Sequence, residues 1–498
     1  MKKIILKAGK EKPLLRKHPW VFSGAIERIV DGATEGVTEG VVAGAVKRSG
    51  QDNAQGHSKK PLSTAEPGES ALYCSRDGKP LALGYYNPKT QLCGRILSFG
   101  PLDGTNRGAS QTTPPGRDPN RSLPDGENPD EIGLDQNFWR KRLEQSIGRR
   151  KNLLLASRGQ TTGCRLVMSE SDQLPGLVVD LYGSWLVVQV LTAGIDRVID
   201  QLINPLWEIT TDLLASVYAA ALRQGITPLP PQKLEGILEK SDDAMRTLEG
   251  LPARVLVRRE QEESDKSSPK EQKEFCSFRE NGITLTVDLY GGQKTGYYHD
   301  QRDNHALIGS LAQDLKVLDC CSYTGGFTLA ALQGGARQVI SLDQSANALD
   351  RLEHHLHLNE TLLTVAGETP LENRWKRMQG DAFKLLRQLA DDQELFDLVI
   401  LDPPKFAAKE SHVQKAARGY KDLNLWGLRL VRPGGLLATF SCSGHINPDL
   451  FQKIVFGAAL DAKKEVQIIR WFQQGEDHPV LMSFPESYYL KGLLLRVL

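Results

Sequence analysis

The sequence carries almost no net charge and no segment that would hold it in a membrane. Its 498 residues contain 62 lysines and arginines against 61 aspartates and glutamates, so net charge alone does not point to a partner. No run of about 18 uncharged apolar residues occurs, and the first residues lack the apolar core of a signal peptide. We therefore expect a cytoplasmic protein that is not associated with a membrane.

Cysteines are few and lack the spacing of a disulfide framework or a zinc site. There are seven, an odd number, with no Cys-x-x-Cys pair and no His/Cys cluster at zinc spacing. The adjacent Cys320 and Cys321 stand where a strand should end, which predicts buried free thiols. The expected protein has neither disulfides nor a metal.

Length predicts two or three domains, and the composition divides the chain into three segments. Short β-rich runs separated by turns fill residues 1–134, and an α+β pattern that begins with Asp135 as a helix N-cap fills residues 135–274. From 275 to 498, near-continuous apolar strands alternate with helices, which is typical of a mainly parallel, doubly wound α/β sheet. Polar stretches are predicted to be loops or insertions at 47–68, 100–130 and 260–274.

Acidic residues are predicted at successive strand ends of the third segment. Because ligands of such sheets bind beyond the carboxyl ends of the strands, Asp319, Asp343 and Asp402 are expected to face one pocket. A glycine turn after Asp319 opens a helix whose N–H groups could face a negative group. The turn is neither G-x-G-x-x-G nor a P-loop, so S-adenosylmethionine is favoured over a pyrophosphate or triphosphate ligand.

The predicted cofactor contacts come from these acids, the glycine turn and an acidic turn after the third strand. The predicted cofactor-binding residues are Asp319, Tyr323, Thr324, Gly325, Gly326, Phe327, Asp343, Asp381, Ala382 and Asp402. Asp343 ends a strand at a position from which a carboxylate can accept hydrogen bonds from both ribose hydroxyls. The ordered set of acids therefore predicts an adenosine ligand.

The chemistry is predicted at two strand ends, with Cys442 and Asp402 as catalytic residues. Asp402 is followed by a rigid turn and an aromatic ring that could stack on a flipped base, and the predicted substrate-binding residues there are Pro403, Pro404, Lys405 and Phe406. Cys442 follows the strand 436–440. A thiolate that attacks carbon 6 of a pyrimidine makes carbon 5 able to accept a methyl group. The competing interpretation is a small packed thiol.

The ordered motifs resemble those of class I S-adenosylmethionine-dependent methyltransferases, which have a Rossmann-like fold. A closer resemblance is to the bacterial RlmI-type 23S ribosomal RNA (cytosine-C5) methyltransferases. It is carried by residues 292–302, 321–327, 402–406, 418–422 and 440–444, and residues 174–180 and 488–492 fit as well. The resemblance implies bound S-adenosylmethionine, with its methionine tail near Asp319, its ribose on Asp343 and its adenine near Asp381.

The same resemblance implies an N-terminal PUA domain, a central domain and a C-terminal methyltransferase domain. Residues 12–22 resemble the PUA opening, and Lys17 and Trp20 are predicted to contact RNA phosphates and bases there. The other interpretation of this stretch is a core aromatic pair under a solvated basic face. Many RNA cytosine-C5 methyltransferases carry a second cysteine where this chain has Lys405. Cys442 is therefore the sole candidate nucleophile, and no proton-removing base is assigned.

Three functions remain open on the sequence. The leading hypothesis is methylation of a cytosine carbon 5 in large-subunit ribosomal RNA. An N-methyltransferase acting on an exocyclic amine or a guanine nitrogen would use Asp402 and leave Cys442 merely packed. An RNA-binding ribosome assembly factor would keep the pocket without turnover. The oligomeric state also stays open, with a homodimer as one option.

Overall fold

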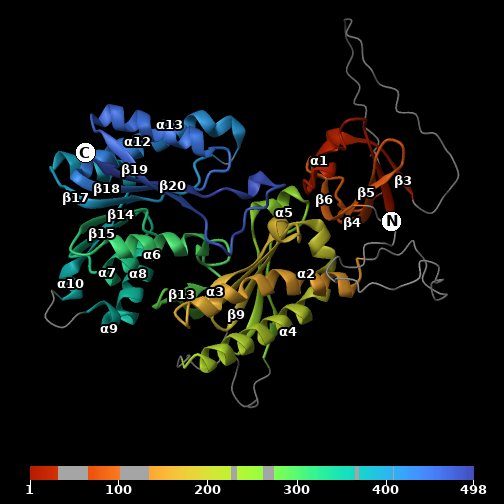
Figure 1. Ribbon diagram of the computed structural model, residues 1–498, viewed down its shortest axis with the longest axis horizontal. Helices are drawn as coiled ribbons and strands as arrows, with labels where there is room; N and C mark the ends of the chain where they lie inside the picture. The colour runs from red at the N-terminus through yellow and green to blue at the C-terminus, as the bar shows by residue number, and fades with distance from the viewer. Residues whose placement is uncertain (32–64, 101–133, 226–232, 262–273, 365–369, 408) are drawn as a thin grey trace, which may run out of the picture.

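The computed structural model describes residues 1–31, 65–100, 134–225, 233–261, 274–364, 370–407 and 409–498. In the described residues, three large sheets follow one another along the chain, and a two-stranded sheet lies between the second and the third in sequence. Figure 1 shows the N-terminal sheet at the right, the C-terminal sheet at the left and the central sheet between and below them. The predicted polar insertions at 47–68, 100–130 and 260–274 lie almost entirely outside the described residues.

The N-terminal part of the chain is β-rich, as predicted. Its elements are β1 (Lys2–Leu6), α1 (Lys12–Leu15), β2 (Trp20–Val21), η1 (Ser23–Ala25), β3 (Ile26–Asp31), β4 (Glu69–Cys74), β5 (Pro80–Tyr86) and β6 (Gly94–Phe99). The strands form a sheet in the order β2-β6-β5-β4-β1-β3, in which β1 and β4 are parallel and the other neighbours antiparallel. Ile4, Leu6, Tyr73 and Ile96 lie in its core.

The central part combines a five-stranded sheet with helices on one face. Its elements are α2 (Gln136–Arg149), α3 (Lys151–Ala156), β7 (Gly163–Met168), η2 (Ser169–Asp172), β8 (Leu177–Tyr182), β9 (Trp185–Val190), α4 (Ala193–Arg223), β10 (Gly236–Ser241), α5 (Ala244–Leu248) and β11 (Arg254–Glu260). The predicted N-cap is confirmed, because the Phe138 backbone N–H donates to Asp135 Oδ1 at 2.7 Å. Helices α2 and α4 share a hydrophobic core with the sheet, whose strand order is β11-β10-β9-β8-β7.

The C-terminal part begins with a hairpin and continues as a seven-stranded sheet. Its strands are β12 (Phe275–Glu280), β13 (Ile283–Asp288), β14 (Lys316–Cys320), β15 (Gln338–Asp343), β16 (Trp375–Gln379), β17 (Phe396–Leu401), β18 (Val431–Ser441), β19 (Val466–Gln473) and β20 (Lys491–Val497). Strands β12 and β13 pair with each other and pack against Tyr182 and Trp185 on the free face of the central sheet. The large sheet has the order β16-β15-β14-β17-β18-β20-β19.

Helices cover both faces of the large sheet. One face carries α6 (Arg302–Leu311), α7 (Gly326–Gln333), α8 (Ala346–Leu358), α9 (Glu360–Leu363) and α10 (Leu371–Arg374). The other carries α11 (Ala382–Asp391), α12 (Val413–Leu430) and α13 (Pro448–Ala462). Figure 1 shows α12 and α13 above the sheet. The remaining short turns are η3 (His299–Gln301), η4 (Glu410–His412) and η5 (Pro485–Ser487).

The doubly wound, mainly parallel sheet predicted from the apolar strands is confirmed. Strands β14 to β18 pair in parallel. Of the seven strands only β20 runs in the opposite direction, because it pairs antiparallel with both β18 and β19. Strand β17 is buried at every residue because helices lie over both of its faces. No helix of the described residues has the length and apolar character needed to cross a membrane.

Candidate active site

The carboxyl ends of four neighbouring parallel strands form one edge of the large sheet. Taken in the order β15, β14, β17 and β18, these ends carry Asp343, Asp319, Asp402 and Cys442. The residues gather there because parallel strands end at the same edge and each crossover returns over a helix. The structure thus brings together the four side chains on which the sequence prediction rests.

The glycine turn between β14 and α7 leaves no room for larger side chains. Gly325 has a φ of 92°, and a Cβ on it would lie 2.0 Å from Leu352 Cδ1. A Cβ on Gly326 would lie 2.4 Å from His305 Cε1. Tyr323 also has a positive φ, of 49°, so the backbone turns tightly and presents its N–H groups before α7 begins. Thr324 and Phe327 are buried beside this turn.

Asp319 and Asp343 hold the turn from both sides. Asp343 Oδ2 accepts the Tyr323 backbone N–H at 2.8 Å, and its Oδ1 accepts that of Ser345. Asp319 is fully buried, and its Oδ2 accepts the Thr328 hydroxyl at 2.6 Å, while its Oδ1 has no partner among the described residues. Burial raises the pKa of Asp319 to about 6, against the effect of the Thr328 hydrogen bond. An unpartnered acceptor here fits a cationic amino group.

The third acidic position lies beyond β16. Asp381 is the N-cap of α11, and its Oδ1 accepts the Lys384 backbone N–H at 3.0 Å. Ala382 is the first residue of the helix, and both residues are partly exposed. The structure therefore gives Asp381 a capping contact, and its contact with adenine stays a prediction.

Asp402 follows β17 and is oriented by a glutamine outside the predicted set. Gln301 Nε2 donates to Asp402 Oδ2 at 2.9 Å. Asn304 Nδ2 donates to Gln301 Oε1 at 2.5 Å and to the Gln473 carbonyl at 3.1 Å, which fixes the Gln301 amide with its nitrogen toward the acid. Burial raises the pKa of Asp402 to about 7, and the Asp300 charge acts in the same direction. The group is therefore able to act as an acid near neutral pH.

The residues after Asp402 differ in exposure. Pro403 is buried, whereas Pro404 and Lys405 are exposed. Phe406 is half-buried and packs on Tyr420, with ring centroids 4.7 Å apart, and on Phe383 at 6.2 Å. The ring thus has structural neighbours in α11 and α12, and its stacking on a base stays a prediction.

Cys442 is a half-buried thiol at the end of β18. All seven cysteines are free. Cys320 is buried as predicted, whereas Cys321, at the start of the glycine turn, is half-buried, so the prediction of burial is wrong for Cys321. Burial raises the pKa of Cys442 to about 11, and Asp402 acts in the same direction, while Lys294 and Lys405 oppose it. The thiol needs help from cations to form a thiolate at neutral pH.

A segment before α6 contributes residues to the site that the sequence prediction left without a role. Tyr298 is half-buried, with its ring edge-on to Tyr323 at 5.4 Å and its hydroxyl donating to Gln293 Oε1. The exposed Lys294 places its ammonium 4.5 Å from the centre of the Tyr298 ring. The dense polar and aromatic run in 292–302 is the sequence signal that could have identified them.

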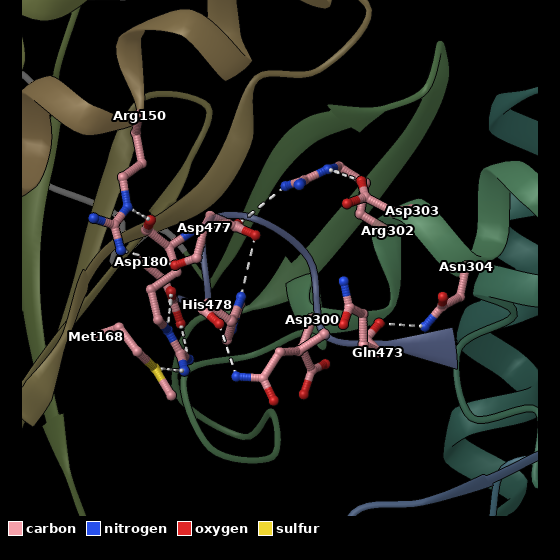
Figure 2. Close-up of polar contacts among 12 residues, drawn as sticks. Arg150, Met168, Asp180, Asp300, Arg302, Asp303, Asn304, Gln473, Asp477 and His478 are labelled. Atoms are coloured by element: carbon pink, nitrogen blue, oxygen red, sulfur yellow. Dashed lines mark hydrogen bonds and ion pairs between the residues drawn. The ribbon is translucent and has the colours of Figure 1, made fainter. Parts of the chain in front are cut away.

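Buried ion pairs tie this segment to the central sheet. Figure 2 shows Asp477 between Arg150 and Arg302. Asp477 Oδ2 accepts from Arg302 Nη1 at 3.0 Å and from the Arg165 backbone N–H, while Arg150 Nη2 donates to the Asp477 carbonyl at 2.9 Å. Arg165 forms paired hydrogen bonds with Asp180, which also accepts the Thr295 hydroxyl at 2.5 Å. The central sheet thus holds the loop that carries Lys294 and Tyr298.

The N-terminal residues predicted to contact RNA belong to another part of the chain: Trp20 lies in β2 of the six-stranded sheet, and Lys17 precedes it. Lys17 is exposed, whereas Trp20 is half-buried and its indole N–H donates to Glu170 Oε1 at 2.8 Å. The Trp20 ring packs edge-on against Phe484, with centroids 4.6 Å apart. Trp20 therefore joins the N-terminal sheet to the rest of the chain, and its contact with RNA stays a prediction. Within the described residues, no group of three or more His, Cys, Asp or Glu side chains could hold a metal ion.

Comparison with known proteins adds family information to this geometry. Residues 201–496 match a family model described as S-adenosylmethionine-dependent methyltransferase, and residues 4–99 match a PUA-like domain. The ribosomal RNA large subunit methyltransferase I of Cronobacter sakazakii is 36% identical over 100% of this chain and 99% of its own, and that of Tolumonas auensis is 36% identical over 99% of both. A candidate methyltransferase structure from Streptococcus mutans shares the fold, with a TM-score of 0.67 and 18% identity over the full length of both chains.

Proposed function

The chain belongs to the ribosomal RNA large subunit methyltransferase I family, and we propose that it methylates carbon 5 of a cytosine in 23S ribosomal RNA through a covalent adduct with Cys442. It is an S-adenosylmethionine-dependent methyltransferase with an N-terminal PUA-like domain. One observation supports the proposed chemistry most directly: a half-buried thiol and a carboxyl group with a raised pKa follow the adjacent strands β18 and β17.

The cofactor fits the part of the sheet edge formed by the carboxyl ends of β14 and β15, which carry Asp319 and Asp343. S-adenosylmethionine supplies an electrophilic methyl group on a sulfonium. The unpartnered Asp319 Oδ1 suits its amino group, and Asp343, which keeps further lone pairs, suits the ribose hydroxyls. The tight turn at Gly325 and Gly326 lets a ligand approach the backbone N–H groups. Contacts of Tyr323, Asp381 and Ala382 with the cofactor are part of the same proposal.

Replacing Gly325 by alanine is expected to weaken cofactor binding by at least about tenfold. The new Cβ would clash with Leu352, and the φ of 92° strains any residue that has a Cβ. Calorimetric titration with S-adenosylmethionine measures the loss. Gly148→Ala in α2 is the matched control, because a Cβ there meets no atom within 4 Å and its φ is not positive. Equal affinity in both variants would contradict the assignment of the turn.

The proposed reaction begins at Cys442 and Asp402. The thiol loses its proton, Sγ bonds to carbon 6 of the cytosine, and the displaced electron pair is shared by carbon 5 and N3, to which protonated Asp402 donates. Once carbon 5 has gained the methyl group, a base removes its proton, the Sγ–C6 bond breaks, and N3 returns its proton to Asp402. Pro403, Pro404, Lys405 and Phe406 are proposed to line the base, and Lys17 and Trp20 to contact RNA farther away.

Asp402→Asn is expected to raise the reactivity of the Cys442 thiol and to lower the rate of methyl transfer. Loss of the carboxylate removes a charge that raises the pKa of Cys442, so alkylation of this thiol should become several-fold faster at about pH 8. Methyl transfer should fall by on the order of a hundredfold or more, because asparagine cannot give a proton to N3. Peptide-resolved iodoacetamide labelling and transfer kinetics measure the two effects. A parallel rise or parallel fall of both rates would refute the role of Asp402.

The substrate is tested by methyl transfer to RNA from cells that lack this protein. Tritiated methyl groups from S-adenosylmethionine should appear in 23S ribosomal RNA, and mass spectrometry should map them to a 5-methylcytosine that is absent before incubation. Label on a nitrogen would favour the N-methyltransferase hypothesis. Absence of label in any RNA or ribosomal particle would favour the assembly factor. A cytoplasmic location and a homodimer belong to the same proposal, and sedimentation equilibrium decides the latter.

A further inference from the structure

Lys491 is a buried cation near the strand end that carries the reacting thiol, and the mechanism above does not use it. It is the first residue of β20 and pairs with Ser441, the last residue of β18, so it lies next to the strand end that carries Cys442. The side chain is only 3% exposed. Its Nζ donates to the Ser443 carbonyl at 2.7 Å and to the Ile446 carbonyl at 2.6 Å. The ammonium thus closes the turn that follows Cys442.

The charge of Lys491 needs an explanation beyond these two hydrogen bonds. No carboxylate of the described residues forms an ion pair with it, although burying an unpaired ammonium is costly. Neutral donors could hold the same two carbonyls. Burial lowers the pKa of Lys491 to about 8, and Cys442 acts in the opposite direction. Of the groups that act on the pKa of Lys491, only Cys442 can become an anion.

The other cations near the thiol are exposed to solvent. The charged groups that shift the pKa of Cys442 are Asp402, Asp300, Lys294 and Lys405. Cys442 in turn shifts the pKa values of Lys491, Tyr298 and Tyr420. Lys294 and Lys405 extend into water, where their fields are screened. A cation locked by two carbonyls in the interior acts in a lower dielectric and cannot move away.

We propose that Lys491 is a positioning residue for the covalent step: it fixes the Ser443–Ile446 turn and, through its ammonium charge, stabilises the Cys442 thiolate. The inference rests on the proposed covalent function, since it names the group that prepares the nucleophile. Arginine at 491 keeps the charge, methionine removes the charge and the donors, and glutamine removes the charge while its amide still donates.

Alkylation of Cys442 by iodoacetamide, followed by peptide-resolved mass spectrometry across a range of pH, tests the proposal without RNA or methyl donor. Lys491→Met should lower the labelling rate at about pH 7.5 by roughly tenfold and move its midpoint upward by about one pH unit. Lys491→Gln should behave in the same way, while Lys491→Arg should stay near the wild-type profile. Lys453→Met, which changes a largely exposed lysine of α13, is the control and should have no effect.

A wild-type profile in either neutral variant would overturn the proposal. Failure of both neutral variants to fold, with a folded Lys491→Arg, would also count against it, because Lys491 would then be needed for folding alone. These outcomes are separate from failure of the proposed function. Loss of methyl transfer in Cys442→Ala supports the covalent function whatever the labelling profile of the Lys491 variants shows.

Discussion

Replacing Cys442 by alanine is expected to reduce methyl transfer to ribosomal RNA by on the order of a thousandfold or more. Carbon 5 of cytosine becomes nucleophilic only while a covalent bond to carbon 6 exists, and Cys442 is the thiol at the end of β18, beside Asp402. The change removes one sulfur atom from a half-buried position, so fold and cofactor binding should persist. Transfer of tritiated methyl groups and calorimetric titration measure the two properties.

Cys74→Ala is the matched control for this variant. It removes a buried thiol from β4, in a different sheet, and should leave the transfer rate unchanged. Full turnover in Cys442→Ala with label on carbon 5 would contradict the covalent mechanism. Full turnover with label on a nitrogen would instead move Asp402 to the centre of an N-methyl transfer.

Replacing Asp477 by alanine is expected to lower the free energy of unfolding by about 3–5 kcal/mol. The side chain is fully buried and accepts from Arg302 and from the Arg165 backbone N–H. Its removal leaves the buried Arg302 charge with only the exposed Asp303 as a partner. Denaturant titration, followed separately in the central and C-terminal parts, measures the loss. Asp350→Ala, which breaks an exposed pair with Arg377, should cost no more than about 1 kcal/mol. Equal losses of unfolding free energy in the two variants would show that the buried Asp477–Arg302 pair stabilises the fold no more than an exposed pair does.

The same residue sets a pH dependence of stability. Burial acts to raise the pKa of Asp477, but His478 and Arg302 hold it well below its usual range. A carboxyl group with a lower pKa in the folded chain than the unfolded value of about 3.9 stabilises the fold above that pH. This contribution is lost as the pH falls through the folded pKa, and Asp477→Ala should lack it.

The sheet edge that carries the candidate active site could be predicted from the sequence, because the residue patterns that indicate strands are local. The continuous apolar run of β17 predicted a strand covered on both faces, and parallel strands place their carboxyl ends together whatever the rest of the chain does. Asp319, Asp343, Asp402 and Cys442 could therefore be assigned to one edge before any contact was known. The helix start at Asp135 was likewise local, since an N-cap bonds to a residue three positions away.

Residues outside the strand ends could not be assigned in this way. Lys294 and Tyr298 precede β14, and contacts with the central sheet, such as that of Asp180 with Thr295, hold the loop that carries them. Trp20 had two interpretations on the sequence, and the choice of Glu170 and Phe484 as its neighbours depends on how the sheets pack. Partners distant in sequence carry no local signal.

The sequence by itself determined the order of the strands' acidic ends, the glycine turn and the single thiol beyond β18, because hydrophobic period and turn chemistry act over a few residues. Only the tertiary structure decided how far burial raises the pKa of Cys442 and which cations lower it. Lys491 is 49 positions from Cys442 in the numbering, yet antiparallel pairing of β20 with β18 places it beside the same strand end. Charges act through space, and the distances between them are fixed by packing rather than by position along the chain.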